Sequence, residues 1–186
     1  MKIIGPTLSW EANRKMSIGR FNLPCKIACP GSTAMCRAKC YAQKAEHSYR
    51  NVLPCRQRNM DSANTDSFVP AMVAQLSKHN PAYFRIHESG DFYNQAYLDK
   101  WAEISRQTPS TTYLAFTKCW GLDWSHIPGN VVVYWSVWPD SIGVPESGPK
   151  AYAGDCGSAG MVECAGHCDQ CMMCFAGQVD VHFKVH

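Results

Sequence analysis

Two helices are predicted in the middle of the chain, over residues 67–78 and 95–106. In each, apolar residues recur at the three- and four-residue spacing that places them on one buried face of a helix. These residues are Val69, Val73 and Leu76 in the first helix, and Tyr97, Trp101 and Ile104 in the second. Asp66 and Asn94 precede the two helices and are expected to cap them.

Three strands are predicted around the second helix, over residues 83–87, 112–117 and 130–137. All three are rich in β-branched and aromatic residues, and short connections join them to the helix. A strand, a helix and a strand in this order form a β-α-β unit, in which the strands are parallel. The predicted fold is therefore α/β, either a small partial (β/α) barrel or an open parallel sheet. The 46% apolar content supports a single domain over residues 1–186.

Polar residues follow each predicted strand directly. They are Glu88, Ser89, Gly90 and Asp91 after the first strand, Lys118 and Cys119 after the second, and Asp140 after the third. Because the carboxyl ends of parallel strands meet at one edge of a sheet, these groups are expected to share a site. His87, at the end of the first strand, fits either this site or the core.

The C-terminal part of the chain carries two further patterns. Residues 139–160 are rich in Gly and Pro, which indicates a long irregular connection. Residues 179–185 alternate apolar and polar positions, which predicts a half-exposed strand at a sheet edge.

Three of the eleven cysteines, Cys29, Cys36 and Cys40, form what we call the first cysteine group. The breakers Pro30, Gly31 and Ser32 place Cys29 on a loop. Residues 34–45 have helix-forming composition, so Cys36 and Cys40 are expected one helical turn apart on one face. Three thiols can then face one inorganic centre.

A second set, the tail cysteine group, comprises Cys164, Cys168, Cys171 and Cys174. The last three have the C-x2-C-x2-C spacing of bacterial ferredoxin-type iron–sulfur sites, in which a distant cysteine followed by Pro completes the ligands. The pair Cys29-Pro30 fits that role. We expect this Cys-rich segment to wrap on the cluster site and the protein to bind one [4Fe-4S] cluster or two, because seven thiols exceed the four that one cluster needs.

Metal ligation explains these cysteines better than disulfides do. No apolar run is long enough to cross a membrane, and residues 1–10 lack the features of a signal peptide, so we expect a cytoplasmic protein without membrane contact. Clustered thiols in a reducing compartment usually bind metals. Zinc is the main competitor, but zinc ribbons pair two C-x2-C motifs, whereas triplets dominate here, so iron–sulfur is favoured.

The first third of the chain is strongly basic. Residues 1–60 contain eleven Lys or Arg residues against two Asp or Glu residues. This excess suggests either a nucleic-acid surface or compensation of a negatively charged cluster by Lys26, Arg37 and Lys39. Compensation is favoured, because no nucleic-acid-binding motif accompanies the charge.

Several motifs together resemble a known family. CPGSTAMCRAKCYA, FRIHESGDF, YLDKW, AFTKCW and the Cys-rich tail are similar to the gene product 88 family of bacteriophages. A more distant resemblance is to phage proteins related to radical S-adenosylmethionine enzymes. That resemblance implies that the first cysteine group holds a [4Fe-4S] cluster, and that Glu88, Ser89, Gly90 and Asp91 hold the methionine moiety of S-adenosylmethionine.

The expected protein is therefore a phage-encoded iron–sulfur protein in the host cytoplasm. Two alternatives remain open. One is an electron carrier or redox sensor in which cysteines ligate every iron, without S-adenosylmethionine. The other is a zinc-stabilised module that contacts a host or phage protein through its basic first third.

Overall fold

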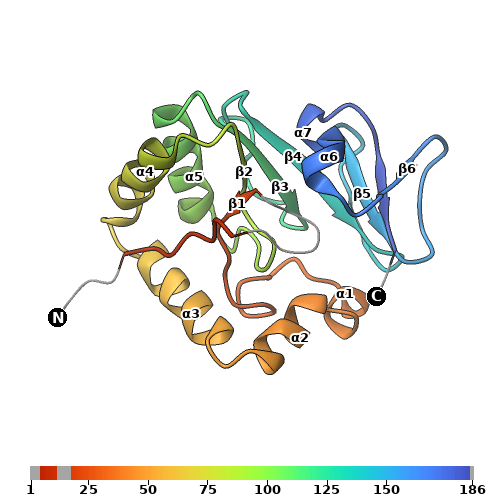
Figure 1. The fold of residues 1–186 in the computed structure, drawn as a ribbon. Coiled ribbons are helices and arrows are strands. Elements are labelled where there is room, and N and C mark those ends of the chain that lie inside the picture. The colour runs from red at the N-terminus through yellow and green to blue at the C-terminus, as the bar shows by residue number, and fades with distance from the viewer. Residues whose placement is uncertain (1–4, 12–17, 185–186) are drawn as a thin grey trace.

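The fold is built on one open sheet of seven parallel strands. The computed structural model describes residues 5–11 and 18–184, and within them the strand order is β1-β2-β3-β4-β5-β7-β6 (Figure 1). The strands are β1 (Gly19–Arg20), β2 (Tyr83–Arg85), β3 (Thr112–Thr117), β4 (Val131–Val137), β5 (Lys150–Ala153), β6 (Val162–Glu163) and β7 (Val181–Phe183). The predicted α/β class is confirmed, with an open parallel sheet.

Seven helices accompany the sheet in the described part of the chain. They are α1 (Ala34–Ala38), α2 (Tyr41–Ser48), α3 (Val52–Ala63), α4 (Phe68–His79), α5 (Gln95–Gln107), α6 (Cys168–Cys171) and α7 (Met173–Ala176). None of the helices in residues 5–11 and 18–184 is long and apolar enough to cross a membrane. Helix α5 is the one predicted over residues 95–106: the Asn94 side chain accepts a hydrogen bond from the Tyr97 amide at 2.9 Å, and Tyr97, Trp101 and Ile104 are buried.

Helix α4 differs from its prediction in both its start and its buried face. Ser67, not Asp66, is the N-cap residue, and the fully buried side chains are Phe68, Met72 and Leu76. Phe68 shifts the buried face because its ring packs against three rings of the core, with centroids 5.4 Å from Phe21, 6.0 Å from Tyr97 and 6.1 Å from Trp101. An aromatic ring buries more apolar area than a valine, so its burial decides the helix orientation.

The two faces of the sheet are covered by different parts of the chain. Phe84 and Tyr113 face α4 and α5 and belong to the larger apolar core. Leu114 and Tyr134 face the C-terminal segment and form a second apolar cluster with Phe175 of α7. Figure 1 shows α4 and α5 on one side of β2 and β3, and α6 and α7 on the other. Both faces are thus buried, as parallel sheets require.

The alternating pattern of the C-terminal strand predicted a position at the edge of the sheet, and this prediction is wrong. Strand β7 lies between β5 and β6, and the two-residue strand β6 is the edge. A two-residue strand such as β6 is too short to be predicted from an alternating pattern. The strand over residues 179–185 was therefore expected to have no neighbour on one side. The positions of residues 185 and 186 lie outside the described residues. Strand β5 also interrupts the connection expected to be irregular over residues 139–160.

His87 belongs to the core. It is 2% exposed, its Nε2 lies 2.9 Å from the Tyr97 hydroxyl, and its ring contacts Phe92 with centroids 4.9 Å apart. Burial, with a smaller effect from Arg85, lowers the pKa of His87 to about 3. The imidazole is therefore neutral in the folded protein at physiological pH.

This buried histidine predicts an acid dependence of stability. Between its unfolded pKa near 6.5 and its folded pKa near 3, the unfolded chain binds the proton that the folded chain excludes. Stability should therefore fall as the pH decreases through this window, by up to roughly 1.4 kcal/mol per pH unit from this group. Urea unfolding of wild type and His87→Gln at several pH values from 7 to 5 measures this effect. The difference between their free energies of unfolding should become smaller as the pH decreases. His47→Gln, at an exposed position, should follow wild type; parallel curves for His87→Gln would contradict the assignment.

Candidate metal centre

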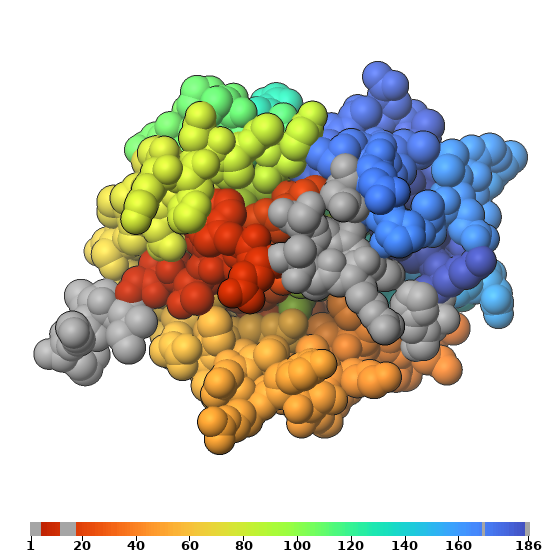
Figure 2. All heavy atoms as spheres, in the orientation of Figure 1, coloured from red at the N-terminus to blue at the C-terminus, as the bar shows by residue number. Residues whose placement is uncertain are grey.

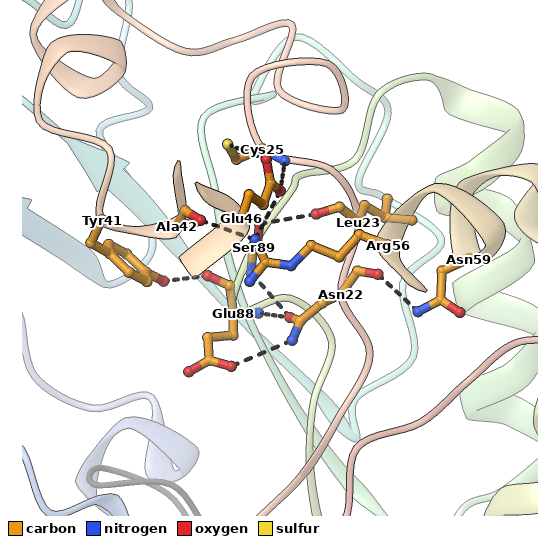
Figure 3. Close-up of polar contacts among 10 residues, drawn as sticks. All are labelled: Asn22, Leu23, Cys25, Tyr41, Ala42, Glu46, Arg56, Asn59, Glu88 and Ser89. Atoms are coloured by element: carbon orange, nitrogen blue, oxygen red, sulfur yellow. Dashed lines mark hydrogen bonds and ion pairs between the residues drawn. The ribbon is translucent and has the colours of Figure 1, made fainter. Parts of the chain in front are cut away.

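The loops after β1 and β2 run side by side at the C-terminal edge of the sheet. The Leu23 amide donates to the Ser89 carbonyl at 2.9 Å, and the Ser89 hydroxyl donates to the Leu23 carbonyl at 2.9 Å. The Asn22 side-chain oxygen accepts the amides of Glu88 and Ser89, at 2.8 and 3.0 Å (Figure 3). These bonds fix the start of the cysteine-bearing loop on the end of β2.

Asp91 joins this pair of loops to the end of β3. Its backbone amide donates to the Ala28 carbonyl at 2.8 Å. Its carboxylate accepts the amide of Phe92 at 2.7 Å, the hydroxyl of Thr117 at 2.6 Å and the amide of Lys118 at 2.9 Å. Burial raises the pKa of Asp91, while Lys118 and these hydrogen bonds oppose the rise. Asp91 is only 4% exposed, and its hydrogen bonds connect the loops that follow β1, β2 and β3.

Gly31 seats the cysteine-bearing loop against the end of β3. A Cβ at this position would lie 2.4 Å from the Lys118 carbonyl oxygen and 2.7 Å from its carbonyl carbon. Both atoms belong to the backbone, so neither can rotate away. The absence of a side chain at Gly31 therefore lets the loop approach β3 this closely.

The loop after β4 holds the first turn of α1. Asp140 accepts the Met35 amide at 2.9 Å, and Ala34 and Thr33 beside it help to lower its pKa against the effect of burial. Thr33 in turn accepts the Cys36 amide at 3.1 Å as the N-cap of α1. A carboxylate at a helix N-terminus accepts hydrogen bonds from free amides and interacts favourably with the helix dipole. The three strand ends expected to share one edge thus do so, and the end of the unpredicted strand β1 joins them.

The helix predicted over residues 34–45 is broken. Helix α1 ends at Ala38, Cys40 has extended backbone, and α2 starts at Tyr41, so Cys36 and Cys40 do not lie on one helix face. Tertiary contacts override the local preference, because α2 docks on the edge of the sheet through its own side chains. The Tyr41 hydroxyl donates to the Glu88 carbonyl, as Figure 3 shows.

The three thiols of the first cysteine group nevertheless lie near one another. Burial raises the pKa of Cys29 to about 12, with smaller contributions from Asp91 and Cys36. Burial also raises the pKa of Cys36, and Cys40 adds to that rise. Each thiol that raises the pKa of another lies within electrostatic reach of it. The chain break at Cys40 therefore still leaves three thiols around one region of the edge.

Lys118 is the cation beside these thiols. It lowers the pKa of Cys29 and Cys36 against the larger effect of burial, and its ammonium donates to the Ser136 hydroxyl at 2.8 Å. Two of the cations expected in this role have other partners. Lys26 donates to the Gln43 side chain at 2.6 Å, and Arg37 donates to the Ser32 hydroxyl at 3.0 Å.

Cys25 is a neighbour of the group with a different environment. Its amide and its thiol both donate to the Glu46 carboxylate, at 2.8 and 3.1 Å, and Arg56 donates to the same carboxylate at 2.8 Å (Figure 3). Burial, Glu46 and Cys40 all raise the pKa of Cys25. A thiol that donates to a carboxylate is held protonated, so Cys25 supports the loop rather than offering a thiolate.

The segment that the resemblance assigned to S-adenosylmethionine makes internal contacts. Glu88 forms an ion pair with Arg20, with 2.9 Å between Oε2 and Nε. Gly90 has a φ of 91°, and a Cβ there would lie 2.6 Å from the Leu23 Cβ. Ser89 and Asp91 are buried in the bonds described above. Cofactor binding by Glu88, Ser89, Gly90 and Asp91 stays a prediction.

The tail cysteine group gathers beneath the second face of the sheet, away from α4 and α5. Burial raises the pKa of Cys174 to about 12, and Cys164, Cys168 and Cys171 raise it further. Arg85 of β2 opposes this rise. Cys168 and Cys174 pack on the apolar cluster of this face. The expected wrapping of this segment on the first cysteine group is not confirmed.

The donor set at the edge fits a metal that prefers sulfur. All eleven cysteines lie within the described residues and are free thiols, so none is used in a disulfide. Within residues 5–11 and 18–184, no three Cys, His, Asp or Glu side chains stand close enough to hold a metal ion as they are. The buried thiols carry protons at neutral pH, and metal binding must displace these protons and draw the sulfurs together.

Sequence reasoning placed Lys118 at this edge but missed its role, and it did not pair Arg85 with the tail. The signal for Lys118 was its position directly after a predicted strand. Arg85 is a cation inside a predicted buried strand, which is unusual enough to suggest a negative partner. For Cys25, the only signal in the sequence was that it lies four residues before Cys29.

A family model described as Gene product 88 matches residues 4–142, which include the first cysteine group and the loops that seat it. The chain belongs to the gene product 88 family. This gene product 88 family member is 30% identical to the Gene 88 protein of Mycobacterium phage L5 over 132 residues, covering 63% of this chain and 55% of that protein. It is 29% identical to the Gene 88 protein of Mycobacterium phage D29, with the same coverage.

The chain thus spans about half the length of these phage relatives. No solved structure matches it. The family match ends before the tail cysteine group. The two cysteine groups therefore differ in their relation to the family: the first lies inside the matched region, and the tail group lies beyond it.

The seat of the loop gives a direct test of this edge. Gly31→Ala should lower the free energy of unfolding by roughly 1–3 kcal/mol, because its Cβ meets the backbone of Lys118. Gly121→Ala is the matched control, since a Cβ there has no atom within 4 Å and stability should not fall. Urea unfolding measures both. Equal stability of the two variants would show that the loop does not sit on β3 as described.

Proposed function

We propose that this gene product 88 family member binds a [4Fe-4S] cluster through Cys29, Cys36 and Cys40. The observation that carries the proposal is that Gly31 and Asp140 seat the segment bearing these three thiols at the C-terminal edge of the sheet, where Cys29 and Cys36 lie within electrostatic reach of Lys118. Thiolates are the ligands that iron–sulfur clusters use, and three from one short segment are a common part of such sites.

The surroundings of the first cysteine group suit a negatively charged cluster. Lys118 supplies a positive charge that offsets thiolates, and its amide is fixed by Asp91. Asp140 and Gly31 hold the loop and the first turn of α1 in place. The protein's part is thus to present the sulfurs, to balance their charge and to limit the access of water.

Three protein ligands would leave one iron of a cubane cluster without a cysteine. An open position of this kind can accept an outside ligand, and a bound cluster supplies one-electron chemistry. S-adenosylmethionine is the candidate ligand that the distant resemblance suggests. Ser89 and Asp91 are buried and bond within the chain, and the half-buried Glu88 forms an ion pair with Arg20 that a bound ligand would have to share or displace.

The cluster proposal predicts the metal content of matched variants. Anaerobically purified wild type should be coloured and contain at least about four iron and four sulfide per chain. Cys36→Ser/Cys40→Ser should lose that first complement, because serine replaces two soft sulfur ligands. Cys55→Ser is the control, since Cys55 lies on α3 at a distance in sequence from both groups and should keep all iron. Iron, sulfide and zinc analysis with visible absorption on one sample measures this.

Other outcomes separate the alternatives. A colourless wild type with stoichiometric zinc would refute the cluster and favour the zinc-stabilised module. Iron retained in full by Cys36→Ser/Cys40→Ser would refute these ligands. Equilibrium binding of S-adenosylmethionine to the dithionite-reduced protein tests the open position separately. If wild type binds it no better than the double variant, S-adenosylmethionine is not the ligand, and the cluster proposal stands on the metal analysis alone.

A further inference from the structure

The tail cysteine group is brought together by backbone geometry. Cys168 and Cys171 lie three residues apart on the single turn of α6, and therefore on the same side. Met172 then adopts a φ of 49°, which turns the chain into α7 and directs Cys174 back toward the sheet. The Cys164 amide donates to the His182 carbonyl at 2.8 Å, which ties the fourth cysteine to β7.

A half-buried cation, Arg85, faces this group. The guanidinium carbon of Arg85 lies 4.0 Å from the centroid of the Phe116 ring, and its Nε donates to the His87 carbonyl at 2.6 Å. Cys168 and Cys174 are both within electrostatic reach of Arg85. An arginine that points from a strand toward an apolar cluster is stabilised by negative neighbours, and Glu88 is one such neighbour of Arg85. Protonated thiols carry no charge, whereas metal-bound thiolates do.

The segment around the tail cysteine group has little regular structure to hold it. Strand β6 has two residues, and α6 and α7 have four residues each. Its main apolar anchor is Phe175, which is buried and packs against the Tyr83 ring with centroids 4.9 Å apart. Figure 2 shows these blue residues as a lobe at the surface. Short segments of this kind commonly depend on a metal for their fold.

We infer that Cys164, Cys168, Cys171 and Cys174 form a second metal centre, separate from the first cysteine group, in which four thiolates bind an iron–sulfur cluster or a zinc ion above Arg85. Four cysteine ligands complete the shell of either group and leave no open position. The second centre therefore holds the C-terminal segment on the sheet, whereas the first has three cysteines. Its existence does not depend on the proposed function of the first group.

Thiol labelling of the wild-type protein tests this centre without any variant. Cys171 is exposed, so as a free thiol it should react rapidly with iodoacetamide. In the metal-loaded protein it should instead be protected together with Cys164, Cys168 and Cys174, and all four should become reactive together when a chelator removes the metal. Mass spectrometry of the labelled peptides reports each site, with Cys55 as an internal reference.

Metal analysis of paired variants then separates the two centres. Cys168→Ser/Cys171→Ser should lose one complement, about four iron or one zinc per chain, and keep the complement of the first group. Cys36→Ser/Cys40→Ser should show the reverse. Iron lost from the tail variant identifies a cluster, and zinc lost identifies a zinc ion. Rapid labelling of Cys171 in the metal-loaded wild type, or unchanged metal content in the tail variant, would overturn the second centre.

Discussion

The carboxylate of Asp91 is the constraint on which the edge of the sheet depends. It accepts hydrogen bonds from Thr117 and Lys118 after β3, while its own amide donates to Ala28 in the loop after β1. A buried carboxylate is costly unless its oxygens are satisfied, so the three loops must remain together for it to be tolerated. Their position sets where the cysteine-bearing loop lies, because Gly31 rests on the Lys118 backbone. The position of the first cysteine group thus depends on Asp91, which is not one of the proposed metal ligands.

Much of the fold was predictable from apolar spacing, because that spacing reflects burial against a sheet. Helix α5 and strand β3 have nearly the predicted bounds, since Asn94 caps the helix and both elements bury strongly periodic side chains. Helix α4 was found with its buried face rotated, because Phe68 outweighs Val69. The edge strand was misjudged, since a two-residue partner such as β6 leaves almost no periodic signal.

The candidate site was predictable in its location more than in its details. Parallel strands bring their carboxyl ends together, so the sequence alone predicts that Asp91, Lys118 and Asp140 share one edge. The break before Tyr41 depends on the contact of its hydroxyl with the Glu88 carbonyl, and local composition does not encode such a long-range bond. The protonated state of Cys25 depends likewise on Glu46, which lies twenty-one residues away on α2.

The two cysteine groups lie at different positions on one sheet, and each has a cation beside its thiols. Each has a cation supplied by a strand or its end: Lys118 follows β3 at the edge, and Arg85 leaves β2 toward the tail. Without metal, burial keeps Cys29 and Cys174 protonated, so the negative charges near these cations are Asp91 for Lys118 and Glu88 for Arg85. Metal binding would exchange the thiol protons for a metal and leave negative sulfur beside each cation. In the proposed metal-loaded protein, the negative sulfurs would add to the charges of Asp91 and Glu88, so each cation would face a metal centre as well as a carboxylate.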